Sequence, residues 1–298
     1  MSGVPVVTKV ERFSSGFTLI EFSIVLVIIG LIVGGVLVGR DLIAASQVRS
    51  TVAQIEKFQV AANTFRGKYE MLPGDINSVL SSRFGLAARG SNAGEGDGNG
   101  IIEGIYDSAP GSSCGYCPVY GETSMFWRDL GASRLVDGSF NYATATLGSV
   151  TLTTTSTPGI KDYFPAAKLG GGNYFYVWSG GIAVGSHANI GNGKNYFGIS
   201  GVYDNTGVQI QSNTSLLVSQ AYTIDLKIDD GKPQSGRVLA AYVSATSQWA
   251  GNSTPWSLSG NSGTCYDNNG AVDGTPYNYS ISQNNGSGAN CGLSIAFQ

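Results

Sequence analysis

Histidine is almost absent from this chain of 298 residues, which contains a single one, His187. A lone histidine among Gly, Ser and Asn residues is typical of a surface position and not of a catalytic base. The zinc motif His-Glu-x-x-His and the phosphate-binding P-loop are missing as well. We therefore expect no catalytic residue and no enzyme activity.

Charged residues are also scarce, at 12% of the chain, and the formal net charge is −3. This balance offers no basic patch for nucleic acid, so we expect no nucleic-acid partner. Glycine is abundant, with 43 residues, a composition that favours short strands and tight turns. A surface with so little charge suits packing against copies of the same chain.

One long apolar run stands out near the N-terminus. Phe22 to Gly39 are eighteen residues with one polar side chain, Ser23. As a helix they would span about 27 Å, close to the hydrocarbon thickness of a bilayer. A single carboxylate, Glu21, lies at the edge of the run, where a charge needs a partner.

The sixteen residues before Phe17 form a polar leader that carries Lys9, Glu11 and Arg12. A secretory signal places its small cleavage-site residue after the apolar stretch. Here Gly16 comes before it, so cleavage would remove the leader and keep the helix. Positive charge on the leader favours a cytoplasmic N-terminus.

The segment Gly16-Phe17-Thr18-Leu19-Ile20-Glu21 and the apolar run behind it resemble the type IV pilin superfamily, including the pseudopilins of type II secretion. The resemblance implies that a prepilin peptidase cleaves Gly16–Phe17 and methylates the amine of Phe17. It also implies that Glu21 pairs with the Phe17 amine of a neighbouring subunit during assembly.

The same resemblance implies a structural subunit of a pilus-like or type II secretion filament. Its partners would be other copies, related pilins, the prepilin peptidase, an inner-membrane assembly platform and, before assembly, lipid. The precursor would span the bacterial inner membrane once, and the product would be a periplasmic or extracellular filament. A pilin-like surface adhesin or glycan-binding head is the alternative.

We expect an α+β, pilin-like fold in which one long helix packs on a β-rich globular head. The expected parts are a leader (1–16), a transmembrane or assembly helix (17–40), an amphipathic half (41–71) and the head (72–298). Apolar residues continue at steps of three and four from Leu42 to Tyr69. Leu72-Pro73-Gly74-Asp75 should end the helix, because proline breaks the hydrogen-bond ladder.

Two further helices are expected in the head, at 122–136 and 215–229. Strands are expected at 141–155, 174–178, 181–184, 196–199 and 237–243. The Leu72–Asp75 motif, the helix from Glu122 and the segment 227–231 are similar to those of a large pilin-like group of bacterial proteins, and imply no catalytic role. Tyr174, Tyr176 and Trp178 suit either a core or a sugar-stacking surface.

Acidic residues occur in two groups. Glu95, Asp97, Asn99 and Glu103 alternate with glycines like the first half of a calcium loop, although Tyr106 stands where the last ligand is expected. They predict either a structural calcium site or a plain glycine-rich turn; no other cofactor is expected. Asp225, Asp229 and Asp230 lie near a helix C-terminus and require a Lys, Arg or metal partner.

Four cysteines allow three disulfide pairings. We favour Cys265–Cys291, which would close a loop with little core and contribute about 3 kcal/mol in the chain-entropy model. Cys114–Cys117 would then be a local disulfide. A redox-active pair at Cys114–Cys117 and a four-thiolate zinc site remain alternatives.

Overall fold

The structure is a computed structural model. It describes residues 16, 18–106, 113–114, 117–146, 158–180, 193–206, 209–243, 249–251, 264–267, 278–281, 286 and 288–298. The chain divides into two compact units, Met1–Ala45 and Ser46–Gln298. The expected strand at 181–184 and His187 lie outside the described residues.

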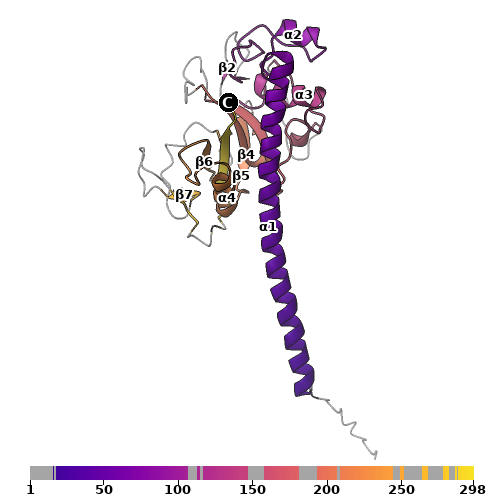
Figure 1. Ribbon diagram of the computed structural model, residues 1–298, viewed down its shortest axis with the longest axis vertical. Coiled ribbons are helices and arrows are strands. Elements are labelled where there is room, and N and C mark those ends of the chain that lie inside the picture. Colours follow the sequence, from indigo (N-terminus) through magenta and orange to yellow (C-terminus); the bar gives the residue numbers. More distant parts are fainter. Residues whose placement is uncertain are drawn as a thin grey trace, which may run out of the picture. The chain divides into compact units, whose positions relative to one another are not determined.

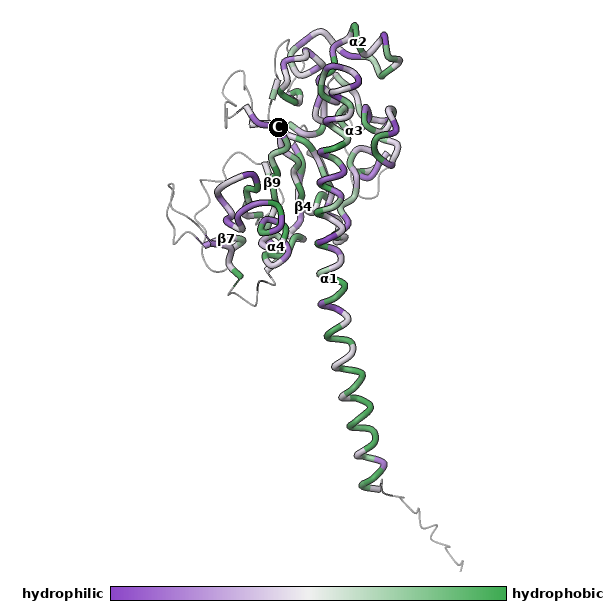
Figure 2. The backbone as a smooth tube through the Cα atoms, in the orientation of Figure 1, coloured by the Kyte–Doolittle hydropathy of each residue, from purple (hydrophilic) through white to green (hydrophobic). Residues whose placement is uncertain are grey.

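Helix α1 (Leu19–Tyr69) includes the whole apolar run. Between Leu19 and Val38, the large apolar side chains are 48% to 88% exposed, and Figure 2 shows this part of the helix as an almost unbroken hydrophobic stretch. An 18-residue window of α1 is apolar and long enough to cross a bilayer, and none of it is buried. Membrane anchors and signal sequences share this property.

From Ser46 onward α1 is amphipathic, and one of its faces is part of the core of the second unit. The ring centroid of Phe58 lies 4.8 Å from that of Trp127 in α3 (Glu122–Ala132) and 5.1 Å from that of Phe175 in β3. The buried side chains recur every three or four residues: Val48, Thr51, Ile55, Phe58, Ala61, Ala62, Phe65 and Tyr69. The helical periodicity of the sequence therefore identified the buried face from Val48 onward, but Leu42, where the expected pattern begins, is exposed.

An antiparallel sheet lies beside this half of α1 (Figure 1). Its strands are β3 (Asn173–Ser179), β4 (Asn195–Thr206), β5 (Gln209–Asn213), β6 (Val238–Tyr242) and β9 (Cys291–Ala296). Within the described part of the chain, the order is β3-β4-β9-β6, and β5 also pairs with β4. The last strand in sequence thus lies in the middle of the sheet, and all six of its residues are buried.

The remaining elements are short. They are α2 (Ser78–Arg83), β1 (Gly104–Ile105), β2 (Ser113–Cys114), η1 (Ile160–Asp162), α4 (Val218–Ile228), β7 (Tyr266–Asp267) and β8 (Asn278–Tyr279). Together with the sheet and α1 they confirm the α+β class.

Three expected elements need correction. The helix expected at 122–136 ends at Ala132, and Arg134 then takes a left-handed φ of 58° that a helix does not allow. The helix expected at 215–229 begins only at Val218. Residues 141–146 form turns instead of the expected strand, and the rest of 141–155 lies outside the described residues.

The cysteines pair as the sequence analysis favoured. The sulfur atoms of Cys265 and Cys291 are bonded, and so are those of Cys114 and Cys117. The first bond connects β9 to the segment just before β7. With all four cysteines in disulfides, the four-thiolate zinc site is not formed.

Candidate functional site

The start of α1 is closed by a reciprocal pair of hydrogen bonds. The backbone N–H of Glu21 donates to Thr18 Oγ1 at 3.3 Å, and the backbone N–H of Thr18 donates to Glu21 Oε2 at 2.8 Å. This is a capping box, in which Thr18 is the N-cap and Glu21 the third helical residue. Glu21 therefore has a structural role within its own chain, one that our reading of the sequence missed although Thr18-Leu19-Ile20-Glu21 carries the pattern.

Gly16 is exposed beside this cap, and Phe17 lies outside the described residues. The expected processing site thus lies immediately before the helix. Nothing in the structure tests the expected cleavage, methylation or pairing of Glu21 with another subunit.

Four glycines of the apolar run, Gly30, Gly34, Gly35 and Gly39, are helical and have no atom of the chain near the position of a Cβ. The fold of one chain therefore does not require glycine there. Each glycine costs a soluble helix about 1 kcal/mol relative to alanine.

A second candidate site is a cluster of carboxylates in the head. Asp75, Asp97 and Glu122 each place one carboxylate oxygen within 4.8 Å of the other two. Asp75 and Glu122 are buried and Asp97 is exposed. We call these three residues the acidic cluster.

The glycine-rich segment wraps around the acidic cluster with its backbone N–H groups pointing inward. Asp75 accepts hydrogen bonds from the N–H groups of Gly98 at 2.8 Å and Gly100 at 2.9 Å. Glu122 accepts from Gly96 and from Glu103, both at 2.9 Å. The two buried carboxylates thus shape the loop that covers them.

Gly74 explains how Asp75 reaches α3. Its φ is +85°, and a Cβ there would lie 2.2 Å from the backbone oxygen of Glu122. Only glycine allows both this conformation and this close approach. The Leu72–Asp75 motif, which was expected only to end the helix, therefore also positions a carboxylate against Glu122.

Burial raises the pKa of Asp75 to about 7, and the negative charge of Asp97 adds to the rise. The pKa of Glu103 also rises to about 7, first through burial and then through the charge of Asp97. Burial raises the pKa of Glu122 well above its usual range, with a further contribution from Asp75. The carboxylates therefore oppose one another's ionisation.

Of the four residues expected to hold a metal, Asp97 belongs to the acidic cluster and Glu103 lies close to it. Asn99 binds Asp97 through its side-chain amide at 3.0 Å. The carboxylate of Glu95 instead accepts the N–H of Asn92 at 2.9 Å. The sequence missed Asp75 and Glu122, because neither belongs to the alternating acidic pattern.

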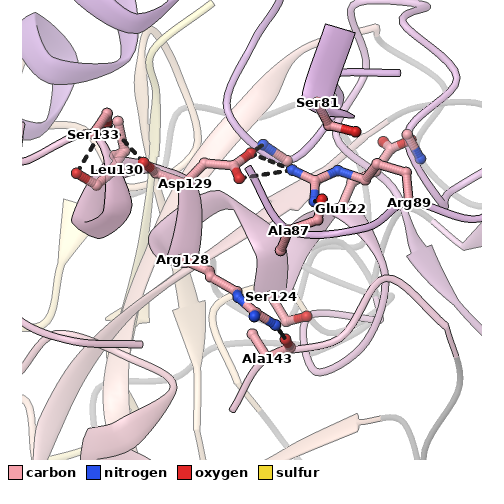
Figure 3. Close-up of polar contacts among 12 residues, drawn as sticks. Ser81, Ala87, Arg89, Glu122, Ser124, Arg128, Asp129, Leu130, Ser133 and Ala143 are labelled. Carbon is pink, nitrogen blue, oxygen red and sulfur yellow. Dashed lines mark hydrogen bonds and ion pairs between the residues drawn. The ribbon is translucent and has the colours of Figure 1, made fainter. Parts of the chain in front are cut away.

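A buried ion pair lies next to this region (Figure 3). Arg89 Nη2 contacts the two carboxylate oxygens of Asp129 at 2.7 and 2.6 Å, and the N–H of Gly74 donates to the same carboxylate at 2.7 Å. Burial raises the pKa of Asp129, while Arg89 opposes the rise. The pair is neutral as a whole and ties the segment after α2 to α3, and the Gly74 bond ties the turn after α1 to the same residue.

Asp225, Asp229 and Asp230 form the other acidic group, and one carboxylate oxygen of each lies within 4.8 Å of the other two, the spacing that a metal partner requires. The alternative of a Lys or Arg partner is wrong for the described residues. The described ion pairs are Lys57–Asp137 and Arg89–Asp129. Asp225 instead accepts the hydroxyl of Tyr279 at 2.8 Å and the N–H of Gly231 at 3.2 Å. Asp229 and Asp230 accept backbone N–H groups of the turn that follows the helix.

The aromatic residues of β3 belong mainly to the core. Tyr176 and Trp178 are buried, and their polar atoms bind Ser200 at 2.8 Å and Ser294 at 3.1 Å. A Cβ at Gly198 would lie 2.0 Å from the ring of Tyr176, so the glycine makes room for it. These two aromatic side chains are therefore not a surface for sugars.

An open groove of about 550 Å³ lies along α1 within the second unit. The groove is lined by apolar side chains, such as Phe58, and by four charged side chains: Lys57, Asp137, Lys161 and Lys168. Lys57 and Asp137 are paired across it at 2.6 Å. The mixture of charges does not define a ligand.

Comparison with models of known protein families, with curated proteins and with solved structures finds no match to this chain.

Proposed function

We propose that this protein is a structural subunit of a pilus-like or type II secretion filament and not an enzyme. The observation that carries the proposal is the order of features at the N-terminus. An exposed glycine is followed by a capped helix start, and then by a long apolar helix whose large side chains are exposed. A chain of this design needs lipid or other helices to cover that surface.

The mechanism starts with the precursor in the inner membrane and its leader in the cytoplasm. A prepilin peptidase cleaves after Gly16, which creates a new amine at Phe17 and keeps α1. The helices then leave the lipid and pack against those of other copies. Because this contact joins different surfaces of two subunits, it extends into a filament instead of closing a dimer.

Glu21 is the residue on which assembly depends. In an apolar bundle its charge is costly unless it meets a cation. The Phe17 amine of a neighbouring subunit supplies one, and the pairing fixes the stagger between subunits. The capping box makes Glu21 structural as well, so an experiment must separate the two roles.

Two variants of Glu21 separate them. Glu21→Gln keeps an oxygen that can complete the capping box but removes the charge, whereas Glu21→Ala removes both. We expect both variants to be cleaved normally and to lose most filaments, measured by electron microscopy and by the yield of sheared filaments. Normal filament yield from Glu21→Gln would show that Glu21 acts only as a cap.

Mass spectrometry of the wild-type protein from purified filaments provides the second measurement. We expect a chain that begins at Phe17 and carries one methyl group on that amine. A native chain that still begins at Met1, found outside any filament, would refute the proposed function.

A further inference from the structure

We propose that the acidic cluster of Asp75, Asp97 and Glu122 binds one calcium ion, with Glu103 as a further carboxylate ligand. This inference does not depend on the filament proposal. It assigns a ligand set that differs from the alternating loop pattern, since two of its residues come from the end of α1 and the start of α3.

The geometry brings the oxygens together before any ion is added. One oxygen from each of three carboxylates lies within 4.8 Å of the others, a spacing that an ion bound at about 2.4 Å from each oxygen can bridge. The N–H groups that bind Asp75 and Glu122 hold these side chains in place. Both carboxylate oxygens of Asp75 and Oε2 of Glu122 each accept one of these N–H groups and retain a lone pair for a cation.

Glu103 supplies an independent observation. Its side chain is buried, with 2% exposed, and its Oε1 has no hydrogen-bond partner. Asp97 and Asp75 raise the pKa of Glu103, and Glu103 raises that of Glu122, so its carboxylate lies near the acidic cluster. The side chain of Glu103 also hydrogen-bonds Ser113 and Asn99. A buried, unpartnered carboxylate oxygen is costly, and a cation in the cluster would remove that cost.

No described lysine or arginine forms an ion pair with any of these four carboxylates, and the buried Arg89 is bound to Asp129. The negative charge is therefore left for a mobile cation. Four carboxylates and no described nitrogen or sulfur ligand favour a hard ion. The exposed position of Asp97, on one side of the cluster, suits the irregular coordination of calcium better than the strict octahedron of magnesium.

The test is a calorimetric titration of calcium into the full-length chain in detergent after treatment with a chelator. We expect one calcium ion per chain and a rise in Tm when calcium is added. Asp97→Asn should weaken binding by at least about tenfold, because it removes one charged ligand. Asp97 is exposed and its charge opposes the ionisation of Asp75 and Glu103, so the Tm of this variant without calcium should be no lower than that of the wild type.

Asp230→Asn is the matched control, because it alters the other acidic group and should leave calcium affinity unchanged. Glu103→Gln is a second variant that should weaken calcium binding. If Asp97→Asn does not fold, the calcium affinity of Glu103→Gln tests the proposal. The proposal is overturned if the wild type binds no calcium, if magnesium binds more tightly, or if these two ligand variants bind calcium like the wild type.

Discussion

At the scale of single residues, the structure shows how this chain stabilises buried acids with few basic residues. Asp225 is buried, and its carboxylate accepts hydrogen bonds from the Tyr279 hydroxyl and the Gly231 N–H instead of pairing with a cation. Burial raises its pKa to about 7, and Asp229 and Asp230 add to the rise. The same burial raises the pKa of the neighbouring Tyr279.

This environment predicts a pH dependence. The pKa of Asp225 is about 7 in the folded chain, against an ordinary value of 3.8. Between these two pH values, Asp225 is protonated in the folded chain and ionised in the unfolded chain. Stability is therefore lost as pH rises from about 4 to about 7. Asp225→Asn has no such proton, so its Tm should exceed that of the wild type by a margin that grows across this window and then levels off.

The measurement is thermal unfolding of both proteins from pH 4 to pH 8. Asp137→Asn is the control, because Lys57 lowers the pKa of the exposed Asp137 from its ordinary value of 3.8, so its difference in Tm from the wild type should stay nearly constant above about pH 4. A constant difference in Tm between Asp225→Asn and the wild type at all pH values would contradict the raised pKa.

At the scale of elements, the two parts of α1 differ in character. The part after Ser46 buries one face against aromatic rings, whereas the large apolar side chains from Leu19 to Val38 are exposed on all faces. The capping box of Thr18 and Glu21 lies at the start of this exposed part. Helix formation therefore does not explain the glycines of the apolar run.

Gly34→Leu tests what those glycines do. A Cβ there meets no atom of its own chain, and leucine is a better helix former than glycine, so the chain should fold with a Tm no lower than that of the wild type. Close packing between helices requires small residues, so we expect a large loss of filament yield. Gly67→Leu is the matched control on the same helix, where a Cβ also meets nothing. Equal yields from both variants would exclude a packing role for Gly34.

At the scale of the whole molecule, the sheet depends on a strand that comes last in the sequence. Strand β9 lies between β4 and β6 and pairs with both, for example through Leu293 with Ile199 and Ala240. The bond from Cys291 to Cys265 holds this strand to a distant part of the chain. Such a tie restricts the unfolded chain over 26 residues of separation.

The two disulfides should therefore differ in their effect on stability. Removing Cys265–Cys291 by two Cys→Ser changes should lower the free energy of unfolding by about 3 kcal/mol, against about 2 kcal/mol for Cys114–Cys117, since the loop closed by the latter is much shorter. Thermal unfolding of the two variants measures the difference. A larger loss from the Cys114–Cys117 change would contradict this reasoning.

The sequence by itself determined the features that depend on neighbouring residues. The length and period of α1, its end before Pro73 and the strand at Tyr174–Trp178 follow from spacings of two to four residues. Such patterns are readable because their partners are close along the chain.

Only the tertiary structure decided which distant residues meet. Asp75 and Glu122 carry no shared pattern, and they converge because Gly74 allows the chain to approach α3 closely. Strand β9 is too short to stand out from the Gly- and Asn-rich sequence before it, and its place in the sheet is set by burial on both sides. Contacts of this kind depend on how the chain returns on itself, and spacing in the sequence does not record that.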